Sequence, residues 1–222
     1  MSGYTHMAAG AAFAFAALAK PDSIPAAVPC LAAAVLGAAI PDIDQSSRKI
    51  TKRVSFLFVI LLAAVLYADR ALYVETFMHG SISYFVSEHF RLVLGLLLFV
   101  FLSFIGSLSR HRTFTHSVLA LAAFSYSMFL INEPVYMWFL VGYASHLFLD
   151  LFNHMDVMLL WPLQHGWCLH LCSASGVFNT AACAFSALYV LYVFIVFYAF
   201  SIPSDISALV SRVFLGLFPY HI

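Results

Sequence analysis

Long apolar runs separated by short polar stretches dominate the chain. Five runs approach the roughly 17 to 25 residues that cross the hydrocarbon core of a bilayer as a helix. They lie at residues 54–68, 91–109, 117–131, 135–152 and 177–200. The pattern predicts membrane helices joined by short connections.

The two ends of the chain are less regular. Residues 7–19 and 24–40 are alanine-rich and short, and the turn Lys20-Pro21-Asp22-Ser23 separates them. They predict a helical hairpin, either re-entrant or fully spanning. Residues 203–222, which begin at a proline, predict either an interfacial helix or a last crossing. The expected fold is therefore an all-α, multi-pass transmembrane helical bundle of about 6–8 membrane helices.

Composition supports this prediction and excludes other classes. Hydrophobic residues make up 64% of the chain and charged residues 9%, whereas soluble domains average roughly 45–50% and about 25%. No linker divides residues 1–222, which we expect to form a single integral membrane domain. A net charge of zero gives no basic footprint for nucleic acid. The four cysteines contain no CxxC pair, so neither a zinc ribbon nor a disulfide framework is indicated.

Counting crossings places the scattered ionisable residues on one side of the membrane. If His6 starts on one side, the hairpin returns the chain to that side at Asp42 and Asp44. The next two runs lead out and back to His111 and His116, and the following pair returns at His146 and Asp150. We therefore expect all seven residues to lie together.

Lys and Arg in short loops indicate the orientation of the chain. The side with the seven ionisable residues carries Arg48, Lys49, Lys52, Arg53, Arg110 and Arg112, and the other side carries Lys20, Arg70, Arg91 and Arg212. The predicted site is accordingly cytoplasmic.

Residue spacing supports a metal site. His146 and Asp150, four apart, lie on one face of an apolar helix, and an ionisable pair within a membrane helix suggests a function. A structural His–Asp hydrogen bond is the alternative. His111 and His116 converge if Thr113 or Thr115 caps the helix that begins between them. Either histidine alone would suit a membrane boundary, so the case rests on the pair.

The earlier residues give weaker signals. Asp42 and Asp44 follow Pro41 and can offer oxygens to one cation or bridge two, although such a sequence also suits a solvated helix exit. His6 follows a possible cap, Thr5, but a loose N-terminal histidine is the alternative. Several ionisable residues that follow Asp150 in the sequence could add a metal ligand or a proton carrier, and we single out none of them. They are His154, Asp156, His165 and His170.

Imidazole and carboxylate ligands without thiolate suit zinc, with manganese or iron as alternatives. Seven candidate ligands, His6, Asp42, Asp44, His111, His116, His146 and Asp150, exceed a mononuclear zinc set. Either two ions or one ion with supporting carboxylates is therefore expected. Asp44 is the residue expected to orient or bridge. Arg110 and Arg112 flank His111 and either bind a phosphate or only follow the positive-inside rule.

The chain also resembles a known family. Its His6, Pro41-Asp42-Ile43-Asp44, His111-Arg112-Thr113-Phe114-Thr115-His116-Ser117, Gly142-Tyr143-Ala144-Ser145-His146 with Asp150, and Leu160-Trp161-Pro162 are similar to motifs of the YdjM-like inner-membrane proteins. Those proteins are described as membrane-bound metal-dependent hydrolases. A looser similarity links the ordered His and Asp pattern to the zinc phospholipase C and single-strand nuclease group. Asn153-His154-Met155-Asp156 departs from the Asn-Thr-x-Gly frequent in the family, which leaves the ligand set open.

Together the residues and the resemblance predict a zinc-type hydrolase in the inner membrane. It would use a metal-activated water on a phospholipid or a lipid-linked phosphoester, with Asp44 and Arg112 assisting. An ion or proton transporter is one alternative, although transport sites usually lie near the bilayer midplane. A non-enzymatic membrane factor with a structural polar cluster is another.

Overall fold

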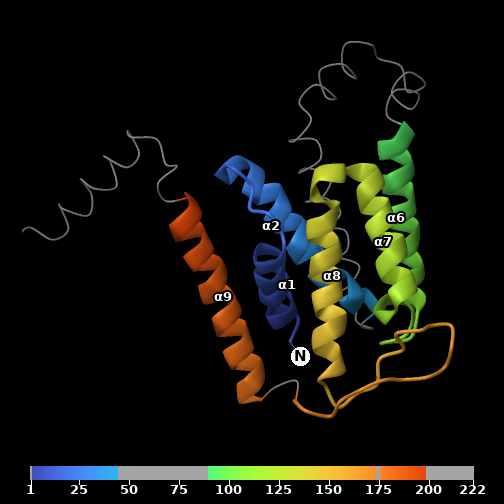
Figure 1. Cartoon of the computed structure of the whole chain (residues 1–222). Helices are drawn as coiled ribbons and strands as arrows, with labels where there is room; N and C mark the ends of the chain where they lie inside the picture. Colours follow the sequence, from blue (N-terminus) through green and yellow to red (C-terminus); the bar gives the residue numbers. More distant parts are fainter. Residues whose placement is uncertain (1, 45–89, 174–175, 199–222) are drawn as a thin grey trace, which may run out of the picture.

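Helices pack into a bundle throughout the part of the chain that the structure describes (Figure 1). This computed structural model describes residues 2–44, 90–173 and 176–198. The predicted segment 54–68 and the stretch 203–222 lie outside the described residues. The α-helices are α1 (Gly3–Ala17), α2 (Ile24–Ala39), α6 (Phe90–Leu108), α7 (Val118–Ile131), α8 (Tyr136–Leu151) and α9 (Val177–Tyr198), and the 3-10 turns are η1 (Ile40–Asp44), η2 (Phe114–His116) and η3 (Glu133–Val135).

The all-α prediction is confirmed. Among the described residues, three segments are long and apolar enough to cross a membrane: Ile24–Asp44, Phe90–Leu108 and Val177–Tyr198. The expected N-terminal hairpin is α1 with α2. Helix α1 begins before residue 7 because Ser2 is its N-cap, with a hydroxyl that accepts a hydrogen bond from the Thr5 amide. The cap predicted at Thr5 is therefore wrong, since Thr5 already lies in the first turn.

Glycines let α2 and α8 cross with their backbones in contact. A Cβ atom at Gly37 would lie 2.1 Å from the carbonyl oxygen of Phe139, and one at Gly142 would lie 2.1 Å from that of Ala34. Gly10 of α1 meets the same crossing, because its Cβ would lie 2.5 Å from the Cβ of Ala38. Small residues at such crossings are typical of membrane helices. This crossing fixes η1, at the end of α2, relative to α8.

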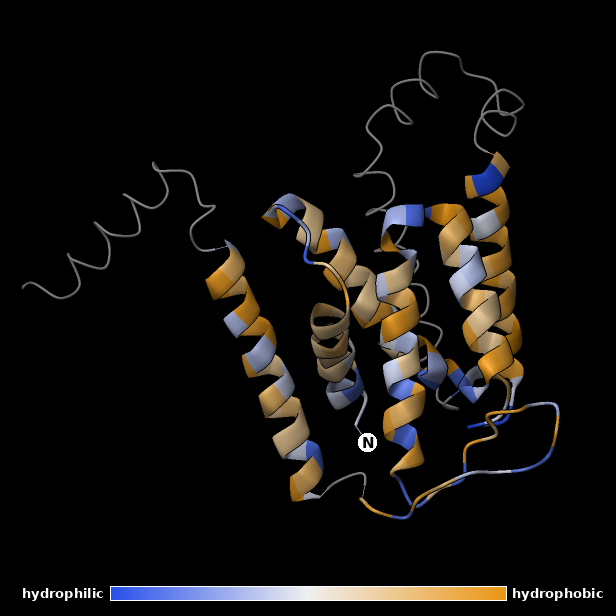
Figure 2. Cartoon of the chain, viewed as in Figure 1, coloured by the Kyte–Doolittle hydropathy of each residue, from blue (hydrophilic) through white to orange (hydrophobic). Residues whose placement is uncertain are grey.

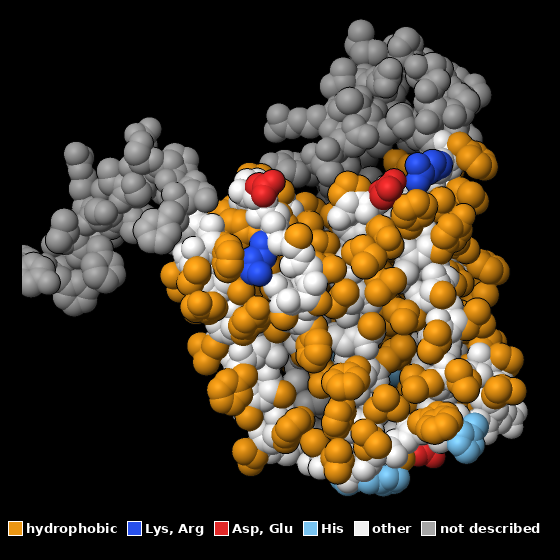
Figure 3. All heavy atoms as spheres, in the orientation of Figure 1, with side chains coloured by type: hydrophobic (Ala, Val, Ile, Leu, Met, Phe, Trp, Pro, Cys, Tyr) orange, Lys and Arg blue, Asp and Glu red, His pale blue; other side chains and the backbone are white. Residues whose placement is uncertain are grey.

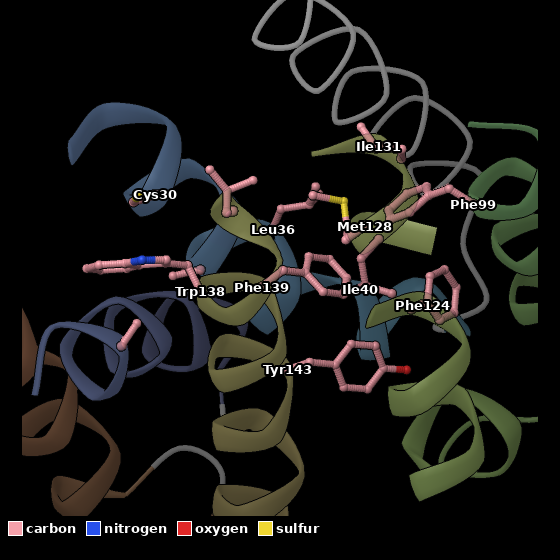
Figure 4. Close-up of a cluster of buried hydrophobic side chains, with 14 of the residues drawn as sticks. Cys30, Leu36, Ile40, Phe99, Phe124, Met128, Ile131, Trp138, Phe139 and Tyr143 are labelled. Atoms are coloured by element: carbon pink, nitrogen blue, oxygen red, sulfur yellow. The ribbon is translucent and has the colours of Figure 1, made fainter. Parts of the chain in front are cut away.

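A core of large apolar side chains lies between α2, α6, α7 and α8 (Figure 4). Phe124, Met128 and Phe139 are fully buried, and Phe99 packs edge-on against Phe124 with ring centroids 5.4 Å apart. Tyr143 is also fully buried, and its hydroxyl donates to the backbone carbonyl of Thr115. The core therefore holds the segment that precedes α7 in a fixed position.

Apolar side chains cover the flanks of the bundle, and polar ones gather at its ends (Figures 2 and 3). Helix α9 shows this most clearly, because Val193 and Tyr198 are its only buried residues. The rest of α9 presents large exposed side chains such as Phe185 and Leu188. A lipid environment satisfies such a surface, so the distribution agrees with a membrane protein.

Candidate metal centre

Four segments that are distant in the sequence meet at one end of the bundle, the lower end in Figure 1. They are the start of α1, turn η1, the connection from α6 to α7, and the end of α8. The side chains they bring together are those expected from counting crossings: His6, Asp42, Asp44, His111, His116, His146 and Asp150. The predicted gathering is confirmed.

Asp150 lies at the centre of this cluster and is 2% exposed. Its Oδ1 is 3.3 Å from Nε2 of His6, and its Oδ2 is 3.4 Å from Nε2 of His116 and 3.7 Å from Nε2 of His146. Asn153, one turn further on, donates from Nδ2 to Oδ1 at 2.8 Å. Three histidines from three different segments therefore face one carboxylate.

A backbone carbonyl group fixes the orientation of the His146 ring. Its Nδ1 is 2.7 Å from the carbonyl oxygen of Ala38, which directs Nε2 into the cluster. His6 stacks on this ring with centroids 3.8 Å apart. A backbone carbonyl on one ring nitrogen is the usual support for a metal-binding histidine, because it fixes the tautomer and the orientation of the ring.

The connection before α7 differs from the prediction in its capping residue. Helix α7 begins at Val118, and the hydroxyl of Ser117 accepts from the Ala120 amide, so neither Thr113 nor Thr115 caps it. His116 lies in turn η2 just before the helix, and His111 precedes that turn. The convergence of His111 and His116 holds because the 3-10 turn bends the chain between them: their ring centroids are 5.5 Å apart.

Asp44 organises this connection. Its Oδ1 is 2.7 Å from Nδ1 of His111, and its Oδ2 accepts from the Arg112 amide at 2.9 Å and the Thr115 hydroxyl at 2.7 Å. The same Oδ2 is 3.2 Å from Nδ1 of His116. One buried carboxylate therefore orients both histidines, which agrees with the expectation that Asp44 orients or bridges.

Arg112 has the left-handed φ of 63°. This conformation is uncommon for a residue with a side chain and costs about 1–3 kcal/mol unless its surroundings impose it. Here it presents the Arg112 amide to Asp44 and turns the side chain inward, where Nη2 is 3.2 Å from Oδ2 of Asp150. Nη1 donates to the carbonyl of Met155. Arg112 thus supports the cluster from within.

The cluster contains three groups of ligand atoms that lie within 4.8 Å of one another: His6, His146 and Asp150; Asp42, His116 and His146; and Asp44, His111 and His116. Three buried ring nitrogens, Nδ1 of His6, Nε2 of His116 and Nε2 of His146, have no hydrogen-bond partner in the described part of the chain. Leaving such atoms unsatisfied is costly. A cation beside Asp150 would satisfy Nε2 of His116 and Nε2 of His146, which both face that carboxylate. The residues therefore fit a metal ion.

The pKa of His116 reflects the two carboxylates that contact it. Burial lowers the pKa of its imidazole, but its contacts with Asp150 and Asp44 outweigh burial and raise the pKa from 6.5 to about 9. The two carboxylates thus favour a positive charge at this position. Because a metal ligand must be deprotonated, a cation bound here would displace that proton.

The other histidines after Asp150 lie apart from the cluster. None of the three ligand groups among the described residues contains His154, Asp156, His165 or His170. Asp156 and His170 contact the thiol of Cys168 in an exposed loop instead.

Two residues that hold the candidate metal ligands in place, Asn153 and Thr115, were not predicted from the sequence. Two signals for Asn153 were available: its spacing of three residues from Asp150, and the asparagine that the resembling family frequently has at this position.

The hydroxyl of Thr115 allows a test of this support. We expect Thr115→Val to weaken metal affinity about tenfold, because removing a group that holds a ligand costs roughly 10–100-fold. Thr113→Val is a matched control, since the Thr113 hydroxyl donates only to the backbone carbonyl of Arg110 and is exposed. Titration of the chelator-treated proteins with zinc measures both affinities. Equal loss in the two variants would contradict the role given to Thr115.

Comparison with known proteins identifies the family but assigns no activity. No curated protein and no solved structure shows a significant match to this chain. The sequence model of the YdjM inner membrane protein family matches residues 1–207, nearly the whole chain, and the protein therefore belongs to that family.

Proposed function

We propose that this protein is a metal-dependent hydrolase that acts on a phospholipid or a lipid-linked phosphoester at the membrane surface. The observation that carries the proposal is a buried cluster in which Nε2 of His6, His116 and His146 all face Asp150. Two of these atoms, Nε2 of His116 and Nε2 of His146, have no hydrogen-bond partner among the described residues. Burying this many ionisable groups in a protein with only 9% charged residues is costly unless they serve a ligand.

The arrangement supports two ion positions. The group of His6, His146 and Asp150 shares no member with the group of Asp44, His111 and His116. Asp42 joins His116 and His146 in a third group, which lies between the other two through these shared histidines. Imidazole and carboxylate donors suit zinc, with manganese or iron as alternatives.

The chain's own residues would bind, orient and admit the substrate. When bound, zinc supplies Lewis acidity to a phosphoryl oxygen and lowers the pKa of a water to about 7. Asp44 orients His111 and His116, and Arg112 holds Asp150 in place. Asp42 and His111, whose side chains are 22% and 35% exposed, form the accessible edge of an otherwise buried cluster. The substrate would approach along this edge.

The position of the cluster favours surface chemistry over transport. Its members come from the start of α1, turn η1, the connection from α6 to α7 and the end of α8, whereas transport sites usually lie midway along broken helices. A water-dependent reaction also needs a site at the aqueous boundary. The transporter and the non-enzymatic factor remain outcomes of the test below.

The test combines metal analysis with an activity screen. Protein purified without chelator is expected to contain one or two zinc ions per chain and to release product from a bacterial lipid extract. The His146→Ala variant should lose both properties. His165→Ala is the control, because His165 lies in the exposed loop and contacts only Trp167 among the ring contacts of the described residues.

Three results would contradict the proposal. Absence of bound metal, or unchanged metal content in His146→Ala, would favour a structural polar cluster. Metal without hydrolysis, accompanied by ion flux in proteoliposomes, would favour a transporter. Hydrolysis that persists in His146→Ala would place the reaction elsewhere.

We also propose that the chain crosses the membrane several times with the cluster on the cytoplasmic side. The count of crossings places six Lys and Arg residues on the side of the cluster and four on the other side, which supports this orientation. Cys168 lies in the loop at the cluster's end, and Glu133 lies in η3 at the other end. An impermeant maleimide should leave Cys168 unlabelled in intact cells when it is the only cysteine, and should label a Glu133→Cys variant that lacks the natural cysteines. The reverse pattern would invert the topology.

A further inference from the structure

A pocket lies next to the metal cluster, on the other side of the segment that carries His111 and His116. Its volume is about 510 Å³, within the roughly 300–1,000 Å³ typical of small-molecule sites. The end of α6, the connection to α7 and the loop after α8 form its walls. The lining residues that matter here are Ile105, Leu108, Arg110, Phe114, Met158 and Trp161.

The pocket and the cluster share a wall. Phe114 lines the pocket, while the neighbouring Thr115 and His116 contact Asp44 in the cluster. The opposite wall is tied to this segment by two backbone hydrogen bonds, from Met158 to the Arg112 carbonyl at 3.1 Å and from Val118 to the Leu159 carbonyl at 2.9 Å. A molecule in the pocket would therefore lie against the segment that carries two of the candidate metal ligands.

The lining combines apolar side chains with one arginine and the polar residues Ser109, Thr113 and Gln164. Phe114 packs edge-on against Trp161 with ring centroids 5.3 Å apart, and Leu108 is 72% exposed. Among the described residues, Arg110 is the only charged residue in the lining. It has no ion pair among the described residues, whereas Arg112 pairs with Asp150. Of the two arginines that flank His111, only Arg110 is placed to meet an anionic ligand.

The position of the pocket at the end of a membrane helix favours an amphiphilic ligand. Leu108 is the last residue of α6, a helix long and apolar enough to cross the membrane. The outer face of α6 exposes large apolar side chains such as Phe101 and Phe104 to the lipid. A tryptophan and an arginine at the end of such a helix lie where acyl chains meet head groups. An acyl chain can enter along α6 while its phosphate stays at Arg110.

We propose that this pocket binds one anionic phospholipid, with its phosphate on Arg110 and an acyl chain against Leu108, Phe114 and Trp161. This rests on the proposed function in one respect: the bound lipid would be the substrate of the neighbouring metal cluster. Guanidinium recognises phosphate through paired, charge-assisted hydrogen bonds. The occupant is therefore a lipid that carries a phosphate group rather than a neutral lipid without one.

The test measures lipid binding in the absence of metal and of catalytic turnover. Chelator-treated protein in detergent is titrated with brominated phosphatidylglycerol, which quenches nearby tryptophan fluorescence. We expect saturable quenching at one lipid per protein that is absent in Trp161→Phe. Arg110→Gln should weaken binding about tenfold, the scale of a lost charge-assisted contact. Brominated diacylglycerol, which lacks the phosphate, should bind the wild type as weakly as phosphatidylglycerol binds Arg110→Gln. Arg91→Gln is the control, because Arg91 pairs with Glu133 at the start of α6.

Other results would overturn the proposal. Quenching that does not saturate, or that is as strong in Arg110→Gln and with diacylglycerol as in the wild type with phosphatidylglycerol, would show only the surrounding lipid. Displacement by inorganic phosphate or glycerol phosphate at the concentrations at which the lipid binds would show an anion site without a lipid pocket. A bound lipid that the metal-loaded protein leaves intact would disprove the proposed function but leave the pocket standing. Lipid hydrolysis without quenching of Trp161 would disprove the pocket but leave the proposed function standing.

Discussion

We expect the Asp150→Asn variant to be purified without metal and to unfold at lower temperature than the wild type even when the wild type is stripped of metal. Asparagine keeps the shape of the side chain but removes the charge that faces His6, His116 and His146. It also leaves Arg112 buried without its carboxylate partner. Removing one member of a buried ion pair costs about 3–5 kcal/mol. Metal analysis and thermal unfolding in chelator measure the two effects.

A double variant separates metal binding from folding. Adding Arg112→Met to Asp150→Asn removes the uncompensated charge, so stability should recover while metal binding stays lost. Asp156→Asn is the matched control, since Asp156 is exposed and lies outside the three ligand groups. If Asp150→Asn kept its metal, or if the double variant regained it, Asp150 would not be the central ligand.

The Gly142→Ala substitution should disrupt the bundle and the metal centre together. Its new methyl group would lie 2.1 Å from the carbonyl oxygen of Ala34, a backbone atom that cannot move without shifting α2. Overpacking of this kind costs about 1–3 kcal/mol and forces backbone shifts. Because η1 continues directly from α2, the shift would move Asp42 and Asp44 away from His146. Unfolding by heat or detergent and zinc affinity should both decline.

Gly3→Ala provides the comparison for this substitution. A Cβ atom at Gly3 would meet only Oδ2 of Asp42, at an ordinary contact distance of 3.7 Å. Alanine also favours a helix more than glycine does, by roughly 1 kcal/mol. The Gly3→Ala protein should therefore keep its stability and its zinc affinity. Unchanged behaviour of Gly142→Ala would mean that α2 and α8 cross with more space than the structure has.

The gathering of the seven ionisable residues was predictable because it depends on few properties of the chain. The number of apolar runs between His6, Asp42, His111 and His146 decides which side each reaches, and that number does not require exact helix boundaries. The pairing of His146 with Asp150 followed from helical spacing alone. Residues 45–89, which carry the first long run, were needed for the count although they lie outside the described part of the chain.

The connection before α7 was predicted less well. Threonines at positions 113 and 115 and a serine at 117 are all acceptable caps by residue type. The choice of Ser117 depends on where the 3-10 turn ends, and Asp44 and Tyr143 anchor that turn through contacts with Thr115. Those partners are 71 and 28 residues away in the sequence. A local pattern carries no information about contacts of that range.

The sequence by itself determined that this is an all-α membrane protein with seven of its histidines and carboxylates gathered at one end, because hydropathy and helical period act locally. Only the tertiary structure decided which atoms face one another. The positive φ of Arg112 turns that side chain toward Asp150, while Arg110, two residues earlier, lines a separate pocket. Such a division depends on a single backbone dihedral angle and on helices packed from distant parts of the chain.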